Sequence, residues 1–176
     1  WDMDGKQQAK LAGHRDEIIG ITFAENARRL ATLDVSKHVY IWDITQSHPT
    51  TVIDLSAWPH AAARIENISM SPDGDKIAIL SIDTNPILKL WDISTGRSFR
   101  TIKWEQATRP FYNYILSSDW DILAWIAGGT VQLMDVSSGA VGPTFTHEDA
   151  LSEWHFSPDE RTFVTRAAET ISGNFT

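Results

Sequence analysis

The sequence predicts an all-β protein assembled from a repeated unit of four strands. A Trp-Asp pair recurs at Trp1, Trp42 and Trp91, at intervals of 41 and 49 residues. A short polar turn recurs in phase with these pairs, and no segment shows a sustained helical period with capping residues. Self-similarity at about 40 to 45 residues is typical of repeat architectures in which each unit contributes four strands.

Each unit begins with two apolar segments joined by a polar turn, a pattern that predicts a hairpin. In the second unit the segments are 65–70 and 77–80, and the turn is Ser71-Pro72-Asp73-Gly74. Proline presets φ for the first corner of such a turn, and aspartate can bond its own backbone. The corresponding turns of the other units are Ala24-Glu25-Asn26-Ala27, Ser117-Ser118-Asp119-Trp120 and Ser157-Pro158-Asp159-Glu160.

The third strand of each unit ends in the Trp-Asp pair, as 39–43 does, and a more polar fourth strand follows, as in 98–102. One repeat length beyond Trp91 lies Met134, at the end of a segment with the same alternation of apolar and polar residues. A further unit is therefore expected to end in methionine where the others end in tryptophan. Trp120 also precedes an aspartate, but it lies in a turn outside this spacing, and we interpret that pair as a coincidence.

These markers resemble those of the WD-repeat β-propeller family. The stretch from Trp1-Asp2 to Gly13-His14 matches the family's segment between Trp-Asp and the next Gly-His almost position for position. His14 precedes Ala24 by ten residues and His147 precedes Ser157 by ten, which is the family's spacing from Gly-His to the turn. The resemblance covers essentially the whole chain and implies about four antiparallel four-stranded blades in a partial ring.

The resemblance also implies where the blades begin and end. Residues 1–13 are expected to finish a preceding blade with the end of its third strand and its fourth strand; 14–57, 58–104 and 105–145 are blades, and 146–176 is an incomplete blade. Family rings usually close with about six to eight blades, so we expect a longer parent protein. A small ring closed by the N-terminal fourth strand is the alternative. Without such closure, the chain expressed alone is expected to self-associate.

In the family, a histidine in the loop leading into the blade, a Ser or Thr on the second strand, an aspartate in the following turn and the tryptophan form a buried hydrogen-bonded tetrad. The resemblance assigns His14, Thr32 and Trp42 to three of these roles. Val35 stands where the aspartate belongs, and Asp34 lies one place too early. We expect an unpaired buried group, costing about 1–3 kcal/mol, unless water or Asp34 reaches it.

Composition narrows the classes of partner. The 176 residues include 15 Lys and Arg and 23 Asp and Glu, a formal net charge of −8, and 42% are hydrophobic, which predicts a folded globular chain. Binding to nucleic acid or to an anionic membrane needs clustered cations, and the strongest basic cluster is the pair Arg28 and Arg29, so we expect neither partner. With no apolar stretch of about 18 residues and no signal segment, a cytoplasmic location is expected, with the nucleus as the open alternative.

Motifs that carry chemistry are scarce. The chain has no cysteine, which excludes disulfides, thiolate zinc sites and cysteine nucleophiles. None of the six histidines is spaced for a metal site of two imidazoles and a carboxylate, and His147-Glu148-Asp149 is better explained as a blade histidine followed by loop carboxylates. No nucleophile elbow, phosphate loop or dinucleotide fingerprint occurs. We expect no enzymatic activity, no metal and no cofactor.

Loops presented by a rigid scaffold are the usual carriers of function. The expected binding face is therefore formed by the loops leading into each blade and by the turns between second and third strands. Trp58 stands at such a junction, where an exposed tryptophan could anchor a partner, the alternative being a tryptophan folded onto its own loop. The candidates are Arg15, Asp16, Lys37, Trp58, His60, Asp83, Asn85, Arg109 and Glu148.

The expected function is a non-catalytic scaffold or sensor module of a larger intracellular signalling protein, with proteins or peptides as partners. The sequence argues against two other functional classes. Thr101 follows Phe99-Arg100, so the Phe-Arg-Arg-Gly motif of phosphoinositide-binding propellers is absent. The arginine that ubiquitin-ligase receptors carry after Trp-Asp is replaced by Asp4, Thr45 and Ser94. A propeller enzyme with its active site on the loop face is the alternative.

Overall fold

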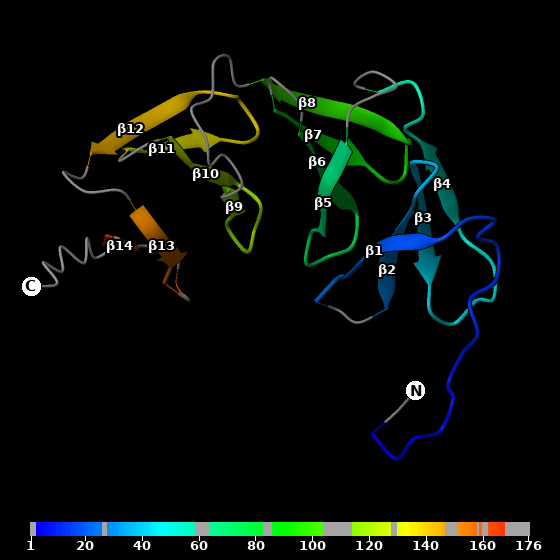
Figure 1. Cartoon of the computed structure of the whole chain (residues 1–176). Coiled ribbons are helices and arrows are strands. Elements are labelled where there is room, and N and C mark those ends of the chain that lie inside the picture. The colour runs from blue at the N-terminus through cyan, green and yellow to red at the C-terminus, as the bar shows by residue number, and fades with distance from the viewer. Residues whose placement is uncertain are drawn as a thin grey trace, which may run out of the picture. The chain divides into compact units, whose positions relative to one another are not determined.

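The computed structural model describes residues 3–25, 28–58, 64–82, 86–103, 114–127, 130–146, 151–157, 159 and 162–167. The regular structure in these residues consists of fourteen β-strands, which confirms the predicted all-β class. The strands form three four-stranded sheets and one two-stranded sheet, each made of consecutive antiparallel strands (Figure 1). No helix in this part of the chain is long and apolar enough to cross a membrane.

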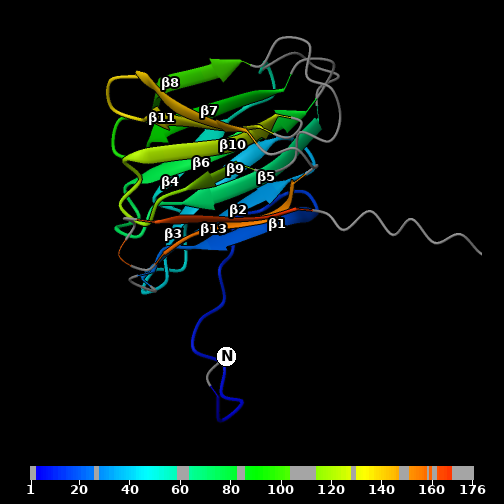
Figure 2. The same ribbon diagram turned by 90° about the vertical axis from the view of Figure 1, so that its left-hand side faces the viewer.

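The strands follow chain order within every sheet. The first sheet contains β1 (Ile18–Phe23), β2 (Arg29–Asp34), β3 (His38–Asp43) and β4 (Thr51–Asp54). The second contains β5 (Arg64–Met70), β6 (Lys76–Ile82), β7 (Ile87–Asp92) and β8 (Arg97–Lys103), which Figure 2 shows one below another from β8 to β5. The third contains β9 (Tyr114–Leu116), β10 (Ile122–Ala127), β11 (Thr130–Asp135) and β12 (Val141–Thr146). The fourth pairs β13 (Leu151–Phe156) with β14 (Phe163–Ala167).

The chain divides into two compact units, Trp1–Gln106 with the first and second sheets and Ala107–Thr176 with the third and fourth. In the first unit, one apolar core lies between the two sheets. Alternate residues of each strand point to the same side, so Leu33 and Ile41 enter this core from the first sheet and Ile79 enters it from the second. The core therefore joins two blades, since neither sheet could bury its apolar face alone.

In the second compact unit, Ala107–Thr176, the third and fourth sheets share a smaller apolar core. Phe156 and Phe163 pack against buried residues of the third sheet, with their ring centroids 5.2 Å apart. Met134, at the expected place in β11, is buried like Trp42. Trp120 lies in the turn before β10 with φ of +64°, as its position outside the repeat spacing indicates.

The polar turns that recur in the sequence share one pattern of hydrogen bonds. In the second sheet, the Ser71 hydroxyl donates to the Asp73 carboxylate at 2.6 Å and accepts from the Lys76 amide at 2.9 Å. A single serine thereby fixes the turn to the strand that follows it. The same serine-to-aspartate bonds join Ser117 to Asp119 at 2.6 Å and Ser157 to Asp159 at 2.5 Å.

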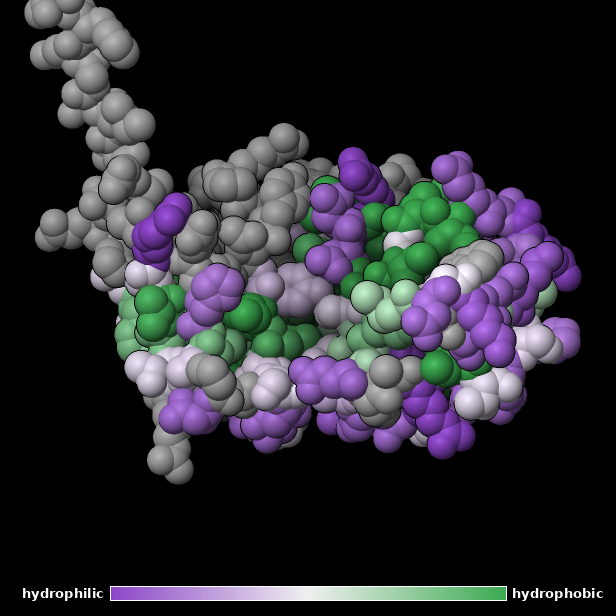
Figure 3. Space-filling model, turned by 90° about the horizontal axis from the view of Figure 1, so that it is seen from below, coloured by the Kyte–Doolittle hydropathy of each residue, from purple (hydrophilic) through white to green (hydrophobic). Residues whose placement is uncertain are grey.

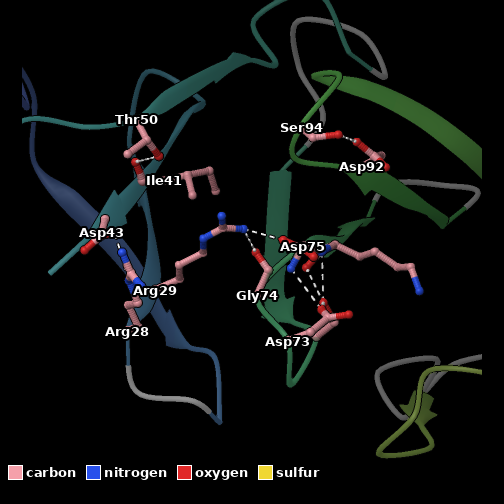
Figure 4. A network of polar contacts seen from close by, with 12 residues as sticks. Arg28, Arg29, Ile41, Asp43, Thr50, Asp73, Gly74, Asp75, Asp92 and Ser94 are labelled. Carbon is pink, nitrogen blue, oxygen red and sulfur yellow. Dashed lines mark hydrogen bonds and ion pairs between the residues drawn. The ribbon is translucent and has the colours of Figure 1, made fainter.

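The corresponding turn of the first sheet begins at Ala24 and lacks this serine. Here Arg29 of β2 donates to the carbonyl oxygen of Gly74 at 3.0 Å and pairs with the Asp75 carboxylate, both in the turn of the second sheet (Figure 4). Gly74 has φ of +76°, and a Cβ there would lie 3.0 Å from the Arg29 side chain. Both the backbone conformation and the approach of the arginine therefore require glycine, and the contact ties the two sheets together.

Candidate functional site at the loops of the first unit

The loop leading into β1 is fastened to the first sheet by a chain of three side chains. The Trp42 indole Nε1 donates to Thr32 Oγ1 at 2.8 Å, and Thr32 Oγ1 lies 2.5 Å from His14 Nε2. Thr32 pairs with Tyr40 across β2 and β3, which places Thr32 and Trp42 on one face of the sheet. The structure thus joins His14, Thr32 and Trp42, the three residues assigned to the tetrad, in one hydrogen-bonded chain.

Gly13 lets the histidine reach this position. Its φ is +151°, in the region that favours glycine, and a Cβ would lie 3.3 Å from Pro49 Cδ and 3.5 Å from the Trp42 ring. Leu11 packs against the cluster that contains Trp42. The close passage of the backbone over the indole is the physical reason for a glycine directly before His14.

Asp34 joins the cluster although it lies one residue earlier than the resemblance implies. Its carboxylate is fully buried, accepts the His38 backbone amide at 2.8 Å, and places Oδ2 4.0 Å from His14 Nδ1. The His38 ring presents its Nδ1 at 3.5 Å from Oδ1 of the same carboxylate. Strand alternation puts Asp34 on the face of Thr32, so a residue that is offset in the sequence still reaches the histidine.

Burial governs the charge of this cluster. It lowers the pKa of His14, against the opposing influence of the Asp34 carboxylate. Burial also raises the pKa of Tyr40, and Asp34 raises it further. A neutral imidazole fits the geometry, because Nε2 can accept a hydrogen bond from Thr32 while the proton on Nδ1 faces Asp34.

A hydroxyl, an imidazole and a carboxylate in series are also the elements of nucleophilic catalysis. Here the Thr32 hydroxyl is buried and already accepts the Trp42 indole, which leaves no approach for a substrate. The described residues contain no group of three or more metal-ligating side chains arranged to hold an ion. The arrangement can therefore hold the loop on the sheet.

Two pockets open beside this cluster, and both are lined by the predicted loop and turn positions. Arg15 and Asp16 line one of them, and Lys37 lines the other. The first, of about 370 Å³, is lined by Gly13, Arg15, Asp16, His38, Tyr40, Pro49 and Val52. The second, of about 310 Å³, is lined by Ile19, Asp34, Val35, Lys37, Arg64, Ile65 and Glu66.

Trp58 lies at the edge of the core between the first two sheets. It is half-buried, and Lys89 Nζ stands 4.8 Å from its ring centroid and 5.6 Å from that of Trp91. Packing and a cation–π contact therefore tether the segment after β4 to β7. The remaining predicted contact residues lie outside the described part of the chain: His60, Asp83, Asn85, Arg109 and Glu148.

This tether occupies the place that the hydrogen-bonded chain has in the first sheet. Trp91 pairs across the second sheet with Ile77, two residues before Ile79, so Ile79 stands where Thr32 stands in the first sheet. The indole Nε1 of Trp91 is buried without a hydrogen-bond partner. Sequence reasoning missed Lys89, although its position two residues before a Trp-Asp pair was a signal that could have found it.

Sheets of four consecutive antiparallel strands, whose third strands end at Trp42-Asp43, Trp91-Asp92 and Met134-Asp135, define the architecture of WD-repeat β-propeller blades. The chain is 34% identical over 102 residues to WD repeat-containing protein 3 of Mus musculus, an alignment that covers 57% of this chain and 10% of the relative. Together the blades and this similarity confirm the WD-repeat β-propeller resemblance. No family model matches the chain.

Two further relatives cover more of the chain at lower identity. The 66 kDa stress protein of Physarum polycephalum is 24% identical over 113 residues, 64% of this chain and 18% of the relative. Apoptotic protease-activating factor 1 of Rattus norvegicus is 24% identical over 169 residues, 92% of this chain and 13% of the relative. The chain thus spans a small fraction of the length of each relative, 10% for WD repeat-containing protein 3.

Proposed function

We propose that this chain is a non-catalytic module that binds other proteins or peptides through the loops leading into its blades and the turns between second and third strands. The observation that carries the proposal is the position of Arg15, Asp16 and Lys37. Arg15 and Asp16 line one pocket and Lys37 lines another, and the adjacent residues Lys37 and His38 place the two pockets on either side of the β2–β3 turn.

The β2–β3 turn has the features of a binding surface: an ordered backbone and exposed side chains. Lys37 has φ of +66°, its amide donates to the Asp34 carbonyl at 3.0 Å, and its carbonyl accepts the Leu55 amide at 2.9 Å. Val35 and Ile19 nearby are 50% and 54% exposed. Exposed apolar side chains bordered by charges, on a backbone that is already ordered, suit a protein partner because little conformational freedom is lost on binding.

Within this class, we propose a scaffold or sensor module of a larger cytoplasmic signalling protein. The similarity to a protein named apoptotic protease-activating factor supports a regulatory setting. The buried state of the Thr32 hydroxyl supports a non-catalytic role over an enzyme with its active site on the loop face.

The binding surface is tested in the parent protein with a double variant, Arg15→Ala with Lys37→Glu. Partner affinity is expected to fall at least about tenfold, because truncation of central contacts costs about 1–2 kcal/mol each. Arg97→Ala is the matched control, since Arg97 is an exposed arginine on β8 that lines neither pocket. Quantitative affinity capture followed by binding measurements on each captured protein is the readout, and unchanged affinities in the double variant would contradict the assignment.

The non-catalytic assignment includes the absence of a metal requirement. Chelator treatment is expected to leave the melting temperature unchanged. A drop of several degrees would contradict this, because a structural metal contributes directly to the free energy of folding.

A further inference from the structure

Asp34, buried in one face of the first sheet, stands between two imidazoles from different elements. His14 comes from the loop leading into β1, with Nδ1 4.0 Å from Oδ2, and His38 begins β3, with Nδ1 3.5 Å from Oδ1. The Oδ2 atom and both Nδ1 atoms are buried without a hydrogen-bond partner. A buried carboxylate is costly unless nearby donors offset its charge, so the position of the proton on the His14 imidazole decides how well this cluster is satisfied.

The hydrogen bond at His14 Nε2 decides which protonation state of the imidazole fits the site. The Trp42 indole can only donate, so Thr32 Oγ1 accepts there and keeps its own hydrogen for His14 Nε2. Nε2 then accepts, and the single imidazole proton lies on Nδ1, toward Asp34. A second proton, on Nε2, would force Thr32 to accept twice and would leave its hydroxyl hydrogen without a partner in a buried site.

We propose that this cluster is an acid-sensitive latch for the loop leading into β1, closed when His14 is neutral and released when His14 takes up a second proton. Backbone hydrogen bonds anchor the loop on either side, at Ala12 and at Glu17. Release of His14 therefore frees the stretch between these anchors. That stretch carries Arg15 and Asp16, which line the first pocket.

Burial and the Asp34 carboxylate have opposite effects on the pKa of His14, and their net effect explains why acid releases the latch. Burial lowers the pKa of His14 by more than the Asp34 carboxylate raises it, so the folded state favours the neutral imidazole. A histidine whose pKa is lowered on folding contributes its full stabilisation above its unfolded value of about 6.5. That contribution is lost as the pH falls below this value toward the folded pKa.

Other charged groups face the cluster from the neighbouring elements. His38 also approaches β4, where its Nε2 lies 4.0 Å from the Asp54 carboxylate. The remaining groups are Tyr40, whose ring centroid lies 4.1 Å from that of His14, and Arg15 and Asp16, whose charges act on Tyr40.

The latch is tested by nuclear magnetic resonance on the full chain labelled with nitrogen-15, between about pH 7.5 and about pH 5.5. Hydrogen exchange of the Trp42 indole, corrected for the intrinsic rate, is expected to accelerate up to about tenfold at the lower pH, because an exposed histidine gains about tenfold in protonation for each pH unit below about 6.5. Amides of β6 are expected to stay unchanged. Unchanged exchange at Trp42, or ring nitrogen shifts showing a charged His14 at neutral pH, would overturn the proposal.

Variants separate a latch from a structural role. His14→Gln is expected to abolish the pH response, whereas His48→Gln, a change at an exposed histidine, is expected to keep it. Asp34→Asn removes the charge that raises the pKa of His14, so release is expected to move to lower pH. Faster exchange at every pH without such a displacement would overturn the latch.

The consequence for partner binding rests on the proposed function, but the latch itself does not. If exchange at Trp42 responds to acid and partner affinity does not, the binding surface is wrongly assigned and the latch stands. If affinity falls in acid while exchange at Trp42 stays constant, the latch is overturned and the binding surface stands.

Discussion

Thr32 is the branch point of the polar chain in the first sheet. It accepts the indole of Trp42 and meets the ring of His14, all within a face of the sheet that Leu11 partly covers. A buried donor left without an acceptor loses its hydration without compensation. One hydroxyl therefore satisfies two neighbours, and its removal affects both.

We predict that Thr32→Val lowers the free energy of unfolding by roughly 1–3 kcal/mol for each of the two buried groups that it leaves unpaired. Valine has nearly the shape of threonine, so the change tests the hydrogen bonds and not the packing. Urea unfolding followed by circular dichroism measures the effect. Thr101→Val, an exposed change on β8, is the control and should stay within about 0.5 kcal/mol; equal effects of the two variants would contradict the role assigned to Thr32.

At the scale of the elements, the aspartate that ends a third strand, in a Trp-Asp or a Met-Asp pair, closes the turn that follows. Asp43 accepts the Thr45 hydroxyl at 2.6 Å and the Thr45 amide at 3.0 Å. Arg28 donates to the same carboxylate at 3.0 Å (Figure 4). Asp135 likewise accepts the Ser138 hydroxyl and amide at 2.7 and 2.6 Å. These hydrogen bonds, those from Thr45 and Ser138 foremost, lower the pKa of Asp43 and of Asp135 to about 2.

We predict that both turns lose stability in acid. Because the folded pKa of Asp43 is about 2 and the unfolded value is about 3.9, its contribution is present above about pH 4 and is lost as the pH falls through about 2. Asp43→Asn is therefore expected to reduce the fall in melting temperature between about pH 5 and about pH 2. Thermal unfolding of this variant beside Asp4→Asn, a change in the exposed N-terminal segment, measures the difference, and parallel curves would contradict the prediction.

Trp58 links the segment after β4 to the second sheet. Its ring packs against the core between the first two sheets and lies under the Lys89 ammonium group. We predict that Trp58→Ala lowers the free energy of unfolding by about 2–4 kcal/mol, since the removal of a large packed side chain leaves a cavity. Trp58→Phe should recover most of the loss. If Trp58→Ala melts like the unmodified chain, any loss of partner binding in that variant would instead mark Trp58 as a direct contact.

At the scale of the whole molecule, one face of the first sheet is open to solvent at its β1 side. Ile21 and Phe23 are 62% and 58% exposed, and Ile21 shares the face of Thr32 because the two pair across β1 and β2. Figure 3 shows hydrophobic residues gathered on the first unit and bordered by hydrophilic ones. An exposed apolar face on a strand at the edge of a sheet favours association with another surface.

We predict that the 176-residue chain expressed alone self-associates, and that Ile21→Lys with Phe23→Lys reduces this without lowering the melting temperature. Charges on an exposed edge strand oppose pairing and cost little folding energy where the side chains are already solvated. Light scattering after size-exclusion chromatography measures the mass. Lys replacements at Thr101 and Ser98 on β8 are the control, and a monomeric unmodified chain would contradict the prediction.

The sequence by itself determined the repeat, the strands and the turns. The Trp-Asp spacing, the alternation of apolar residues in β2 and β3, and the serine turns all depend on local chemistry, because strand periodicity and turn geometry act over a few residues. The resemblance to WD-repeat blades, and not local chemistry, assigned His14, Thr32 and Trp42 to one polar cluster, and the register of β2 and β3 places Thr32 and Trp42 on one face.

Only the tertiary structure decided which contacts are made by Asp34, which departs from the family's spacing, and by residues far apart in the sequence. Asp34 reaches His14 because a strand alternates its side chains, so a residue offset in the turn still faces the cluster. Lys89 meets Trp58, and Arg29 meets Gly74, across separations that no local pattern encodes. These contacts, and the pocket that Lys37 lines together with Arg64 and Glu66 of β5, arise when packed sheets bring distant segments together, and that packing is fixed by the whole apolar core.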